Sequence, residues 1–280
     1  MRPILFIMGG AGNVYYQYNY VNKKHGKKIL VSDIFYQRIF KKLLGHTANF
    51  PKHKKTFQNA NFFIVFFYLI FFIFDLILVK IFKKSFFTYF DSTNIKNKPL
   101  LRSLIYFGYF QSNEFLPFNS TINADIFLKS RENKIVNCTE VCVHIRGGDY
   151  LAAYEKDILG TNMPLPSVSW YTKALNILLK DNNLANSVNL VTDDIVFSEN
   201  ILKELQSNFD HISFNLISKS FNSDLNTLLN ADYMIIHNST FALMAAESSI
   251  YLKKAVISDY MKSKCLSESL VSRSKFLSLN

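Results

Sequence analysis

The sequence predicts an α/β protein in which parallel strands alternate with helices. A short apolar run at residues 4–8 enters a glycine-rich loop and then a helical segment. A second apolar run, residues 141–145, also ends in glycines. From there to residue 258 strand-like and helix-like segments alternate regularly. This alternation is typical of a parallel sheet that is covered by helices on both faces.

Length and composition narrow the class of protein. The chain has 280 residues, of which 49% are hydrophobic, so it can bury one large core or two smaller ones and is not disordered. The formal net charge of +11 favours anionic partners such as nucleotide phosphates or a phospholipid surface, although a lysine-rich surface without a binding role is the alternative. No zinc-finger or RNA-binding signature is present, so nucleic acid is the least favoured of the anionic partners. Cys138, Cys142 and Cys265 lack metal-ligand spacing and are interpreted as free thiols in a reducing compartment.

The first segment is predicted to be a β-α-β unit. Residues 4–8 are interpreted as a strand and not as a signal peptide, because the run is short and glycines follow it. After the loop Gly9-Gly10-Ala11-Gly12-Asn13, a helix is expected from about Tyr15 and a second strand at Lys28–Val31. Loop amides and a helix N-terminus favour a phosphate or a sugar, whereas a plain tight turn is the alternative. No Gly-Lys-Ser/Thr follows, so the loop is not a Walker loop.

Residues 62–79 form the longest apolar run, F-F-I-V-F-F-Y-L-I-F-F-I-F-D-L-I-L-V. Its length makes it a transmembrane candidate. A single crossing would, however, separate loop 9–13 from the loop at Arg146, and Asp75 would cost about 2.5–3.5 kcal/mol at a bilayer centre. Two interpretations remain open: a helix buried in the protein, or an aromatic-rich helix lying in a membrane surface. Lysines flank the run on both sides, at Lys52, Lys54, Lys55, Lys80, Lys83 and Lys84.

The loop after residue 145 carries the most information about function. Residues 141–150 read V-C-V-H-I-R-G-G-D-Y, a buried strand followed by a sharp glycine turn. Ligands bind just past the carboxyl ends of strands in open α/β sheets. His144 and Arg146 are two positions apart, so they point to the same side. Arg146 offers a planar, permanently charged fork that fits a pair of phosphates, whereas an ordinary turn with a solvated arginine is the alternative.

The rest of the chain is predicted to continue the same sheet. A domain boundary is placed in the mixed segment Leu116–Asn137, which divides the chain into domains 1–137 and 138–280. The expected helices are Ser169–Lys180 with Ser167 as its cap, Ile195 to about Ser207, Asp224–Asn230 and Ala242–Tyr251. The expected strands are Val188–Thr192, Ile212–Leu216, Tyr233–His237 and Ala255–Ser258.

Two of these strand ends carry polar residues. Asp193-Asp194 can bind a metal, exchange protons or accept hydrogen bonds from a guanine or a ribose, but no third acidic ligand is near, so a metal site is not expected. Capping of the next helix is the alternative. Asn238-Ser239-Thr240 precede a helix N-terminus, where hydroxyls and free amides can hold a diphosphate. A simple N-cap is the alternative there too.

Five ordered segments resemble motifs of the alpha-1,2-fucosyltransferases, glycosyltransferase family 11. H-I-R-G-G-D-Y at 144–150 resembles H-x-R-R-G-D-Y, and G-G-A-G-N-V-Y-Y-Q-Y at 9–18 resembles G-G-L-G-N-Q-M-F-Q-Y. G-Y-F-Q-S at 108–112 matches a family segment, although an aromatic strand or turn in the core would also explain it. T-D-D at 192–194 resembles S-D-D, and N-S-T-F at 238–241 resembles the start of N-S-S-F-S-W-W. The chain departs from the family at Val14, at Gly147, where the family has a second arginine, and at residues 242–244.

The resemblance implies a fold and an activity. Enzymes of that family transfer L-fucose from GDP-fucose to the 2-hydroxyl of a galactoside, with inversion and without a metal or other cofactor. The implied fold is GT-B-like, with two facing doubly wound (Rossmann-like) halves: an N-terminal acceptor-side domain that carries the apolar helix, and a C-terminal domain that binds GDP-fucose. The acceptor would contain galactose, and a lipid-linked surface polysaccharide would suit peripheral contact with an anionic membrane. The expected location is cytoplasmic, on the inner membrane face.

The resemblance also implies roles for residues. Arg146 would sit on the diphosphate and offset charge on the leaving GDP, and His144 would brace the loop or touch the donor. An inverting transfer needs a base, for which Asp149 is the candidate and Glu155 the alternative. The remaining residues expected to bind the donor are Gly10, Gly12, Asn13, Asp193, Asp194, Asn238, Ser239 and Thr240.

Two other functions remain open. Gly147 motivates an inactive relative that binds a nucleotide sugar without turning it over, and residues 62–79 motivate a membrane-surface interaction protein. In an active enzyme, Gly147→Arg is expected to improve donor use by about tenfold or more, because a second charge-assisted contact with the diphosphate is worth roughly 1.5–3 kcal/mol. The loop geometry need not suffer, since glycine accepts any backbone angle that arginine can adopt. The competing possibility is that another lysine or arginine already fills that space, so that the added side chain would clash or repel.

Overall fold

The structure is a computed structural model in which the chain forms two compact units, Met1–Phe127 and Leu128–Asn280. The predicted boundary between residues 137 and 138 lies outside the described residues. The described residues are 2–7, 9–26, 29–32, 58–91, 96–101, 103–108, 124, 128, 140–148, 151, 167–180, 187–261 and 276–279.

The first unit contains a six-stranded sheet with the order β3-β2-β1-β6-β4-β5. The strand pairs are parallel except β4 with β5, which is antiparallel. The order reverses at β1, because β2 and β3 extend the sheet to one side and β6, β4 and β5 to the other. The strands are β1 (Ile4–Phe6), β2 (Leu30–Ser32), β3 (Gln58–Asn59), β4 (Thr88–Asp91), β5 (Lys96–Asn97) and β6 (Ile105–Gly108).

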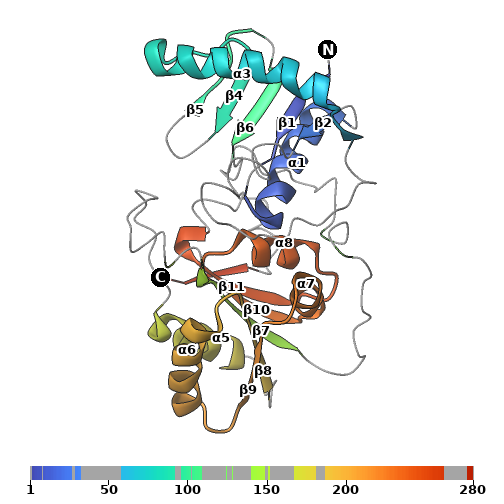
Figure 1. Cartoon of the computed structure of the whole chain (residues 1–280). Helices are drawn as coiled ribbons and strands as arrows, with labels where there is room; N and C mark the ends of the chain where they lie inside the picture. Colours follow the sequence, from blue (N-terminus) through green and yellow to red (C-terminus); the bar gives the residue numbers. More distant parts are fainter. Residues whose placement is uncertain are drawn as a thin grey trace. The chain divides into compact units, whose positions relative to one another are not determined.

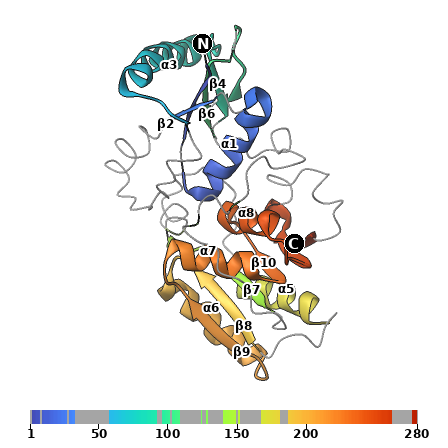
Figure 2. The ribbon, with the colours of Figure 1, turned by 90° about the vertical axis from the view of Figure 1, so that its right-hand side faces the viewer.

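Helices α1 (Ala11–His25) and α3 (Phe62–Phe82) cover opposite faces of this sheet. On one face, Tyr20 of α1 has its ring centroid 6.2 Å from that of Tyr106. On the other, Phe72 of α3 packs on Phe6 and Phe90, at centroid distances of 5.6 and 5.7 Å. Figure 1 shows α3 lying across β4, β6 and β1, and Figure 2 shows α3 and α1 on opposite sides of the strands.

The start of the first helix differs from the prediction. The helix begins at Ala11 and not near Tyr15, because Gly10 is its extended N-cap and accepts a hydrogen bond at its carbonyl from the Val14 amide (3.1 Å). Glycine is required at position 9, where φ is +78° and a Cβ would lie 2.1 Å from Asn13 Nδ2. The second strand lies at Leu30–Ser32, later than the predicted start at residue 28.

The second unit contains a six-stranded sheet, fully parallel, with the order β12-β11-β10-β7-β8-β9. Numbered from its own first strand, this is the order 3-2-1-4-5-6 of a dinucleotide-binding sheet read from the other edge. The strands are β7 (Val141–Ile145), β8 (Ser187–Thr192), β9 (Ser213–Ile217), β10 (Tyr233–Ile236), β11 (Lys254–Ser258) and β12 (Phe276–Leu279).

Helices cover both faces of the second sheet as well. The helices α5 (Val168–Lys180) and α6 (Ile195–Asn208) pack on one face of the sheet, where they share a hydrophobic core with Val143 of β7. Cys142 alternates with Val143 and points to the other face, where its thiol contacts the Thr227 carbonyl of α7 (Phe221–Asn230). The helix α8 (Thr240–Ser248) packs beside α7 (Figure 1). Each unit is therefore doubly wound. This confirms the predicted fold class, a GT-B-like α/β chain with two Rossmann-like halves, in the architecture of each half.

Candidate functional site

The candidate site lies at the switch point of the second sheet, where β7 and β10 are neighbours. The register pairs Ile236 with His144 and Ile145 with Thr192, so β10, β7 and β8 end at nearly the same level. The segments 146–148, 193–194 and 237–240 follow those ends. Three segments that the sequence predicted separately therefore meet at one edge, and this is where open α/β sheets bind ligands.

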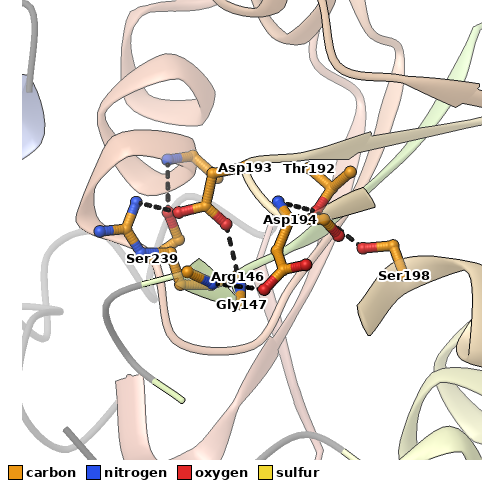
Figure 3. A network of polar contacts seen from close by, with 9 residues as sticks. Arg146, Gly147, Thr192, Asp193, Asp194, Ser198 and Ser239 are labelled. Carbon is orange, nitrogen blue, oxygen red and sulfur yellow. Dashed lines mark hydrogen bonds and ion pairs between the residues drawn. The ribbon is translucent and has the colours of Figure 1, made fainter. Parts of the chain in front are cut away.

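Arg146 is held in place by Asp193. Its Nη1 lies 2.8 Å from Asp193 Oδ2, and the side chains are 28% and 34% exposed. The Gly147 amide donates to the other oxygen of the same carboxylate, Asp193 Oδ1, at 2.9 Å (Figure 3). One carboxylate therefore fixes both the guanidinium and the backbone of the loop that carries it.

Asp194 holds the same loop and caps a helix. Its Oδ2 accepts a hydrogen bond from the Gly148 amide (3.1 Å), and its Oδ1 accepts one from the Phe197 amide (3.0 Å) at the start of α6. Thr192 steadies this turn, since its Oγ1 accepts hydrogen bonds from the Asp194 amide and from Ser198 Oγ (Figure 3). Each carboxylate oxygen of the pair thus has a partner inside the protein. The helix-cap interpretation is confirmed for Asp194, and contact of either aspartate with a nucleoside stays a prediction.

The two glycines of the loop are required by these carboxylates. A Cβ at position 147 would lie 2.5 Å from Asp194 Cβ, closer than side chains approach. At position 148 φ is +40°, and a Cβ would lie 3.1 Å from Asp193 Oδ2. The expectation that an arginine would fit at position 147 without disturbing the loop is wrong, because it considered backbone angles and not the neighbouring Asp194.

His144 is buried, with 4% of its surface exposed, and its Nδ1 has no hydrogen-bond partner among the described residues. The pKa of His144 is lowered to about 4, chiefly by burial; the charge of Asp193 opposes this shift and the charge of Arg146 adds to it. The ring is therefore neutral at neutral pH and too weak a base to activate a sugar hydroxyl. Of its two predicted roles, burial favours bracing the loop over touching a donor.

Two half-buried phenylalanines line the same edge. The ring of Phe241 lies 6.0 Å from that of His144 and 5.4 Å from that of Phe221, measured between centroids. They come from the first turns of α8 and α7. Phe241 belongs to the N-S-T-F motif, but no role was predicted for it. Phe221 has no sequence signal of its own, because its position depends on how α7 packs beside α8.

The N-terminus of α8 lies at this edge too. Ser239 is buried and its Oγ accepts a hydrogen bond from the Ala242 amide (3.2 Å), so the N-cap interpretation is confirmed. Asn238 is also buried, whereas Thr240 is half-buried as the first helical residue. The positive end of the helix dipole favours an anion here. Phosphate contacts by these three residues stay a prediction.

The predicted donor-binding residues of the first unit lie in the loop before α1 and in the first turn of that helix. Gly10 is exposed at the N-cap of α1, Gly12 is buried in its first turn, and Asn13 is half-buried. Their part in donor binding stays a prediction. The proposed bases, Asp149 and Glu155, lie outside the described residues. Within the described ranges, no three His, Cys, Asp or Glu side chains gather where they could hold a metal.

Comparisons with known proteins give structural neighbours only. No family model matches the chain, and no curated protein matches its sequence. The structure of E. coli heptosyltransferase WaaC with ADP is 10% identical and has a TM-score of 0.44, with 99% of this chain and 92% of that chain covered. The structure of the same enzyme with ADP-2-deoxy-2-fluoro heptose is 10% identical and has a TM-score of 0.40, covering 92% and 88%. Because both scores are below 0.5, the proposal below rests on the site and the sequence motifs.

Proposed function

We propose that this protein is a glycosyltransferase that uses a nucleoside diphosphate sugar. The observation that carries the proposal is the Arg146 guanidinium, which Asp193 fixes at the switch point of a sheet with dinucleotide-binding strand order. On the motif resemblance, the donor is GDP-fucose and the acceptor is the 2-hydroxyl of a galactoside. The GT-B arrangement, in which the two halves face each other across the substrates, is part of the same proposal.

The site suits a diphosphate because it offers positive charge that is fixed before the ligand arrives. Asp193 engages Nη1 of Arg146, so the fork is oriented in advance and little ordering remains to be done on binding. The N-terminus of α8 adds amides and the positive end of a dipole. Asp193 also reduces the local net charge, which weakens donor binding. The ion pair therefore improves the positioning of the diphosphate at the expense of its binding affinity.

The proposed reaction is an inverting displacement at the anomeric carbon. The bond from that carbon to the β-phosphate oxygen breaks, a bond to the acceptor oxygen forms, and the hydroxyl proton passes to a base. Negative charge grows on the departing diphosphate, where Arg146 would stabilise it. His144 is a poor candidate for the base, since it is buried and its pKa is lowered to about 4. Asp149 remains the proposed base, with Glu155 as the alternative.

The aromatic pair beside the loop supports a nucleotide as the ligand. Phe221 and Phe241 are half-buried, and their rings lie 5.4 Å apart between centroids next to His144. Stacking of a base on an aromatic ring contributes about 1–3 kcal/mol in proteins that bind single-stranded nucleic acids. In this proposal the purine of the donor stacks on one of these rings. The proposal also keeps a cytoplasmic location on the inner membrane face and a lipid-linked acceptor.

One observation keeps a second candidate function open. Position 147 has no room for the second arginine that the family carries, because a Cβ there would lie 2.5 Å from Asp194 Cβ. The site thus has one fewer positive charge for the leaving group than the family pattern. This favours, as the runner-up, a nucleotide-sugar-binding relative that turns its ligand over very slowly or not at all.

A transfer assay tests the proposal and separates the two candidates. The purified full chain is incubated with labelled GDP-fucose, GDP-mannose or UDP-galactose and with a panel of galactosides. Calorimetry measures binding of the same donors. Galactoside-dependent release of GDP from GDP-fucose, with label in the acceptor, supports the transferase. Binding of GDP-fucose without turnover supports the runner-up, and no binding of any of the three donors contradicts both. Lys203→Gln, a change of an exposed charge on α6, is the control for loss of positive charge.

A further inference from the structure

Helix α3 is seated on the first sheet by one narrow stripe. Its buried residues follow each other at intervals of three and four, which places them on one side of the helix. Phe72 packs on Phe6 and Phe90, and the Tyr68 hydroxyl donates a hydrogen bond to the Arg2 carbonyl. The stripe consists of Val65, Tyr68, Phe72, Asp75 and Val79.

Asp75 is used entirely to hold this helix in the protein. It is fully buried, and its carboxylate accepts hydrogen bonds from the backbone amides of Phe86 (2.8 Å), Phe87 (2.9 Å) and Thr88 (2.6 Å). Hydrogen bonds to an ionised acceptor are stronger than neutral ones. Three of them tie the middle of α3 to the start of β4. The only acidic residue of the apolar run is therefore on the protein side, and the other side carries no carboxylate.

The outer face of α3 is almost entirely apolar and exposed. All its exposed residues are large hydrophobic side chains except Lys80. Taking aromatic side chains at about 200 Å², the face amounts to roughly 1,000 Å², against about 300–600 Å² for the largest apolar patch of an ordinary monomer. The residues, with exposed fractions from 45% to 82%, are Phe62, Phe63, Phe66, Phe67, Ile70, Ile73, Phe74, Ile77, Ile81 and Phe82.

The chain next to the end of α3 carries further exposed apolar side chains and positive charge. Leu100 and Leu101 are 57% and 59% exposed, and their amides donate to the carbonyls of Ser85 and Phe86, just beyond the helix. The exposed lysines at this end are Lys80, Lys83 and Lys84. The outer face of α3 is apolar and has basic residues at one end. This combination matches the chemistry of a bilayer surface that contains anionic lipid.

The packing also decides between lying on a membrane and crossing it. By length and composition α3 is long and apolar enough to cross. A crossing would, however, draw the sheet and the buried Asp75 cluster into hydrocarbon, because the inner stripe of α3 is packed on them along its length. Unpaired backbone groups at the ends and edges of an open sheet are not tolerated there. The helix therefore presents one face, and not its whole circumference, to lipid.

We propose that the outer face of α3 docks the protein on the surface of an anionic bilayer. The helix lies parallel to the membrane, with its phenylalanines and isoleucines about 5–10 Å into the boundary between headgroups and acyl chains. Lys80, Lys83 and Lys84 contact anionic headgroups. The proposal does not depend on the identity of the sugar donor, since it rests on the first unit alone.

Flotation of the full chain with vesicles tests the proposal. Vesicles of phosphatidylcholine alone are compared with vesicles that contain 30% phosphatidylglycerol. Two variants are tested. A triple serine variant combines Phe63→Ser, Phe67→Ser and Phe74→Ser and removes apolar surface. A lysine variant combines Lys80→Gln and Lys84→Gln and removes charge. Lys83 is left unchanged because it is the left-handed C-cap of α3, with φ at +57°. Ile250→Ser, at a residue 69% exposed in the second unit, is the matched control.

The expected result is strong binding to the anionic vesicles that weakens with salt. The triple serine variant should bind at least tenfold less, the lysine variant severalfold less, and Ile250→Ser like the wild type. Equal binding by the serine variant and the wild type would overturn the proposal, as would no binding by the wild type. Self-association that the serine changes abolish, without vesicle binding, would instead make the face a contact between copies of the chain. Retention in cell membranes after alkaline carbonate extraction would show a spanning helix and would also overturn it.

Discussion

The ends of two neighbouring strands are joined by an ion pair between Arg146 Nη1 and Asp193 Oδ2, 2.8 Å apart. Asp193 accepts the Gly147 amide with its other oxygen, so one side chain sets both the guanidinium and its loop. The arrangement makes Asp193 a positioning residue for Arg146. Its contact with a nucleoside stays a prediction.

A double-mutant cycle on Arg146→Ala and Asp193→Ala should show coupling. Residues in direct contact give interaction free energies of about 0.5–3 kcal/mol, so the double variant should be less destabilised than the sum of the single ones. The measurement is urea unfolding of the four proteins. The control is a second cycle, on Lys203→Gln and Asp193→Ala, in which the changes in the free energy of unfolding should add. Additivity in the Arg146 cycle as well would mean that the ion pair does not hold the loop.

Gly147→Ala should destabilise the protein. The added Cβ would lie 2.5 Å from Asp194 Cβ, and this side chain caps α6, so the loop or the cap must move. Overpacking of this kind costs about 1–3 kcal/mol. Gly10→Ala is the stability control, because its Cβ would meet no atom within 4 Å and its φ is −74°. Thermal unfolding would show the difference, and equal stability of the two variants would refute the crowding.

Gly147→Arg should lower donor use, contrary to what the family pattern alone suggests. The arginine carries the same Cβ as alanine and would disturb Asp194 before its charge could reach a diphosphate. Donor kinetics or GDP binding of the variant measures the effect. A rate above that of the wild type would show that the loop can adapt and that the arginine of the family pattern can be restored.

Stability should fall in mild acid because of two buried histidines. Burial lowers the pKa of His237 from 6.5 to about 4, and that of His144 is lowered to about 4 as well. Between pH 6.5 and 4 the unfolded chain binds more protons than the folded one, so the free energy of unfolding decreases as pH falls through this range and is unaffected above it. For His237 the full effect is up to about 3 kcal/mol. Urea unfolding at pH 7 and 5 should show a smaller drop in His237→Gln than in the wild type. The exposed His211 provides the control His211→Gln, and equal slopes in all three proteins would contradict the assignment.

Transfer should not require a divalent metal. Both aspartates that follow β8 are already engaged, Asp193 by Arg146 and Gly147, and Asp194 by Gly148 and Phe197. Turnover in EDTA should therefore equal turnover without it. Loss of activity on chelation, followed by recovery with Mg²⁺ or Mn²⁺, would contradict this prediction and identify Asp193 and Asp194 as metal ligands.

Much of the second unit could be predicted because its local signals agree. The helix expected at Ser169–Lys180 is observed at Val168–Lys180, and Ser167 Oγ accepts from the Trp170 amide as its cap (3.2 Å). Strand periodicity, caps and loop glycines there all indicate the same elements. The short strand β12 at Phe276–Leu279 was not predicted, because four residues hold too little pattern.

The parts that were missed depend on contacts between distant residues. No local pattern reveals that Asp193 and Asp194 hold the loop at 147–148, because that contact exists only once β7 and β8 are paired. Gly108 shows the same effect: its φ is +152° and a Cβ would lie 2.1 Å from the Asp91 carbonyl oxygen on β4, which explains the glycine without a ligand. The apolar run in α3 was left between two interpretations, since both its faces are apolar and only the structure shows which one is covered.

Binding of GDP-fucose to the wild type, Arg146→Lys and Arg146→Ala tests the central claim most directly. Lysine keeps the charge but loses the planar fork, and alanine loses both. Calorimetry at fixed ionic strength should show binding by the wild type, at least tenfold weaker binding by Arg146→Lys, and weaker binding still by Arg146→Ala, while Lys203→Gln binds like the wild type. If Arg146→Ala binds GDP-fucose as tightly as the wild type does, Arg146 is not part of a donor site and the account is wrong.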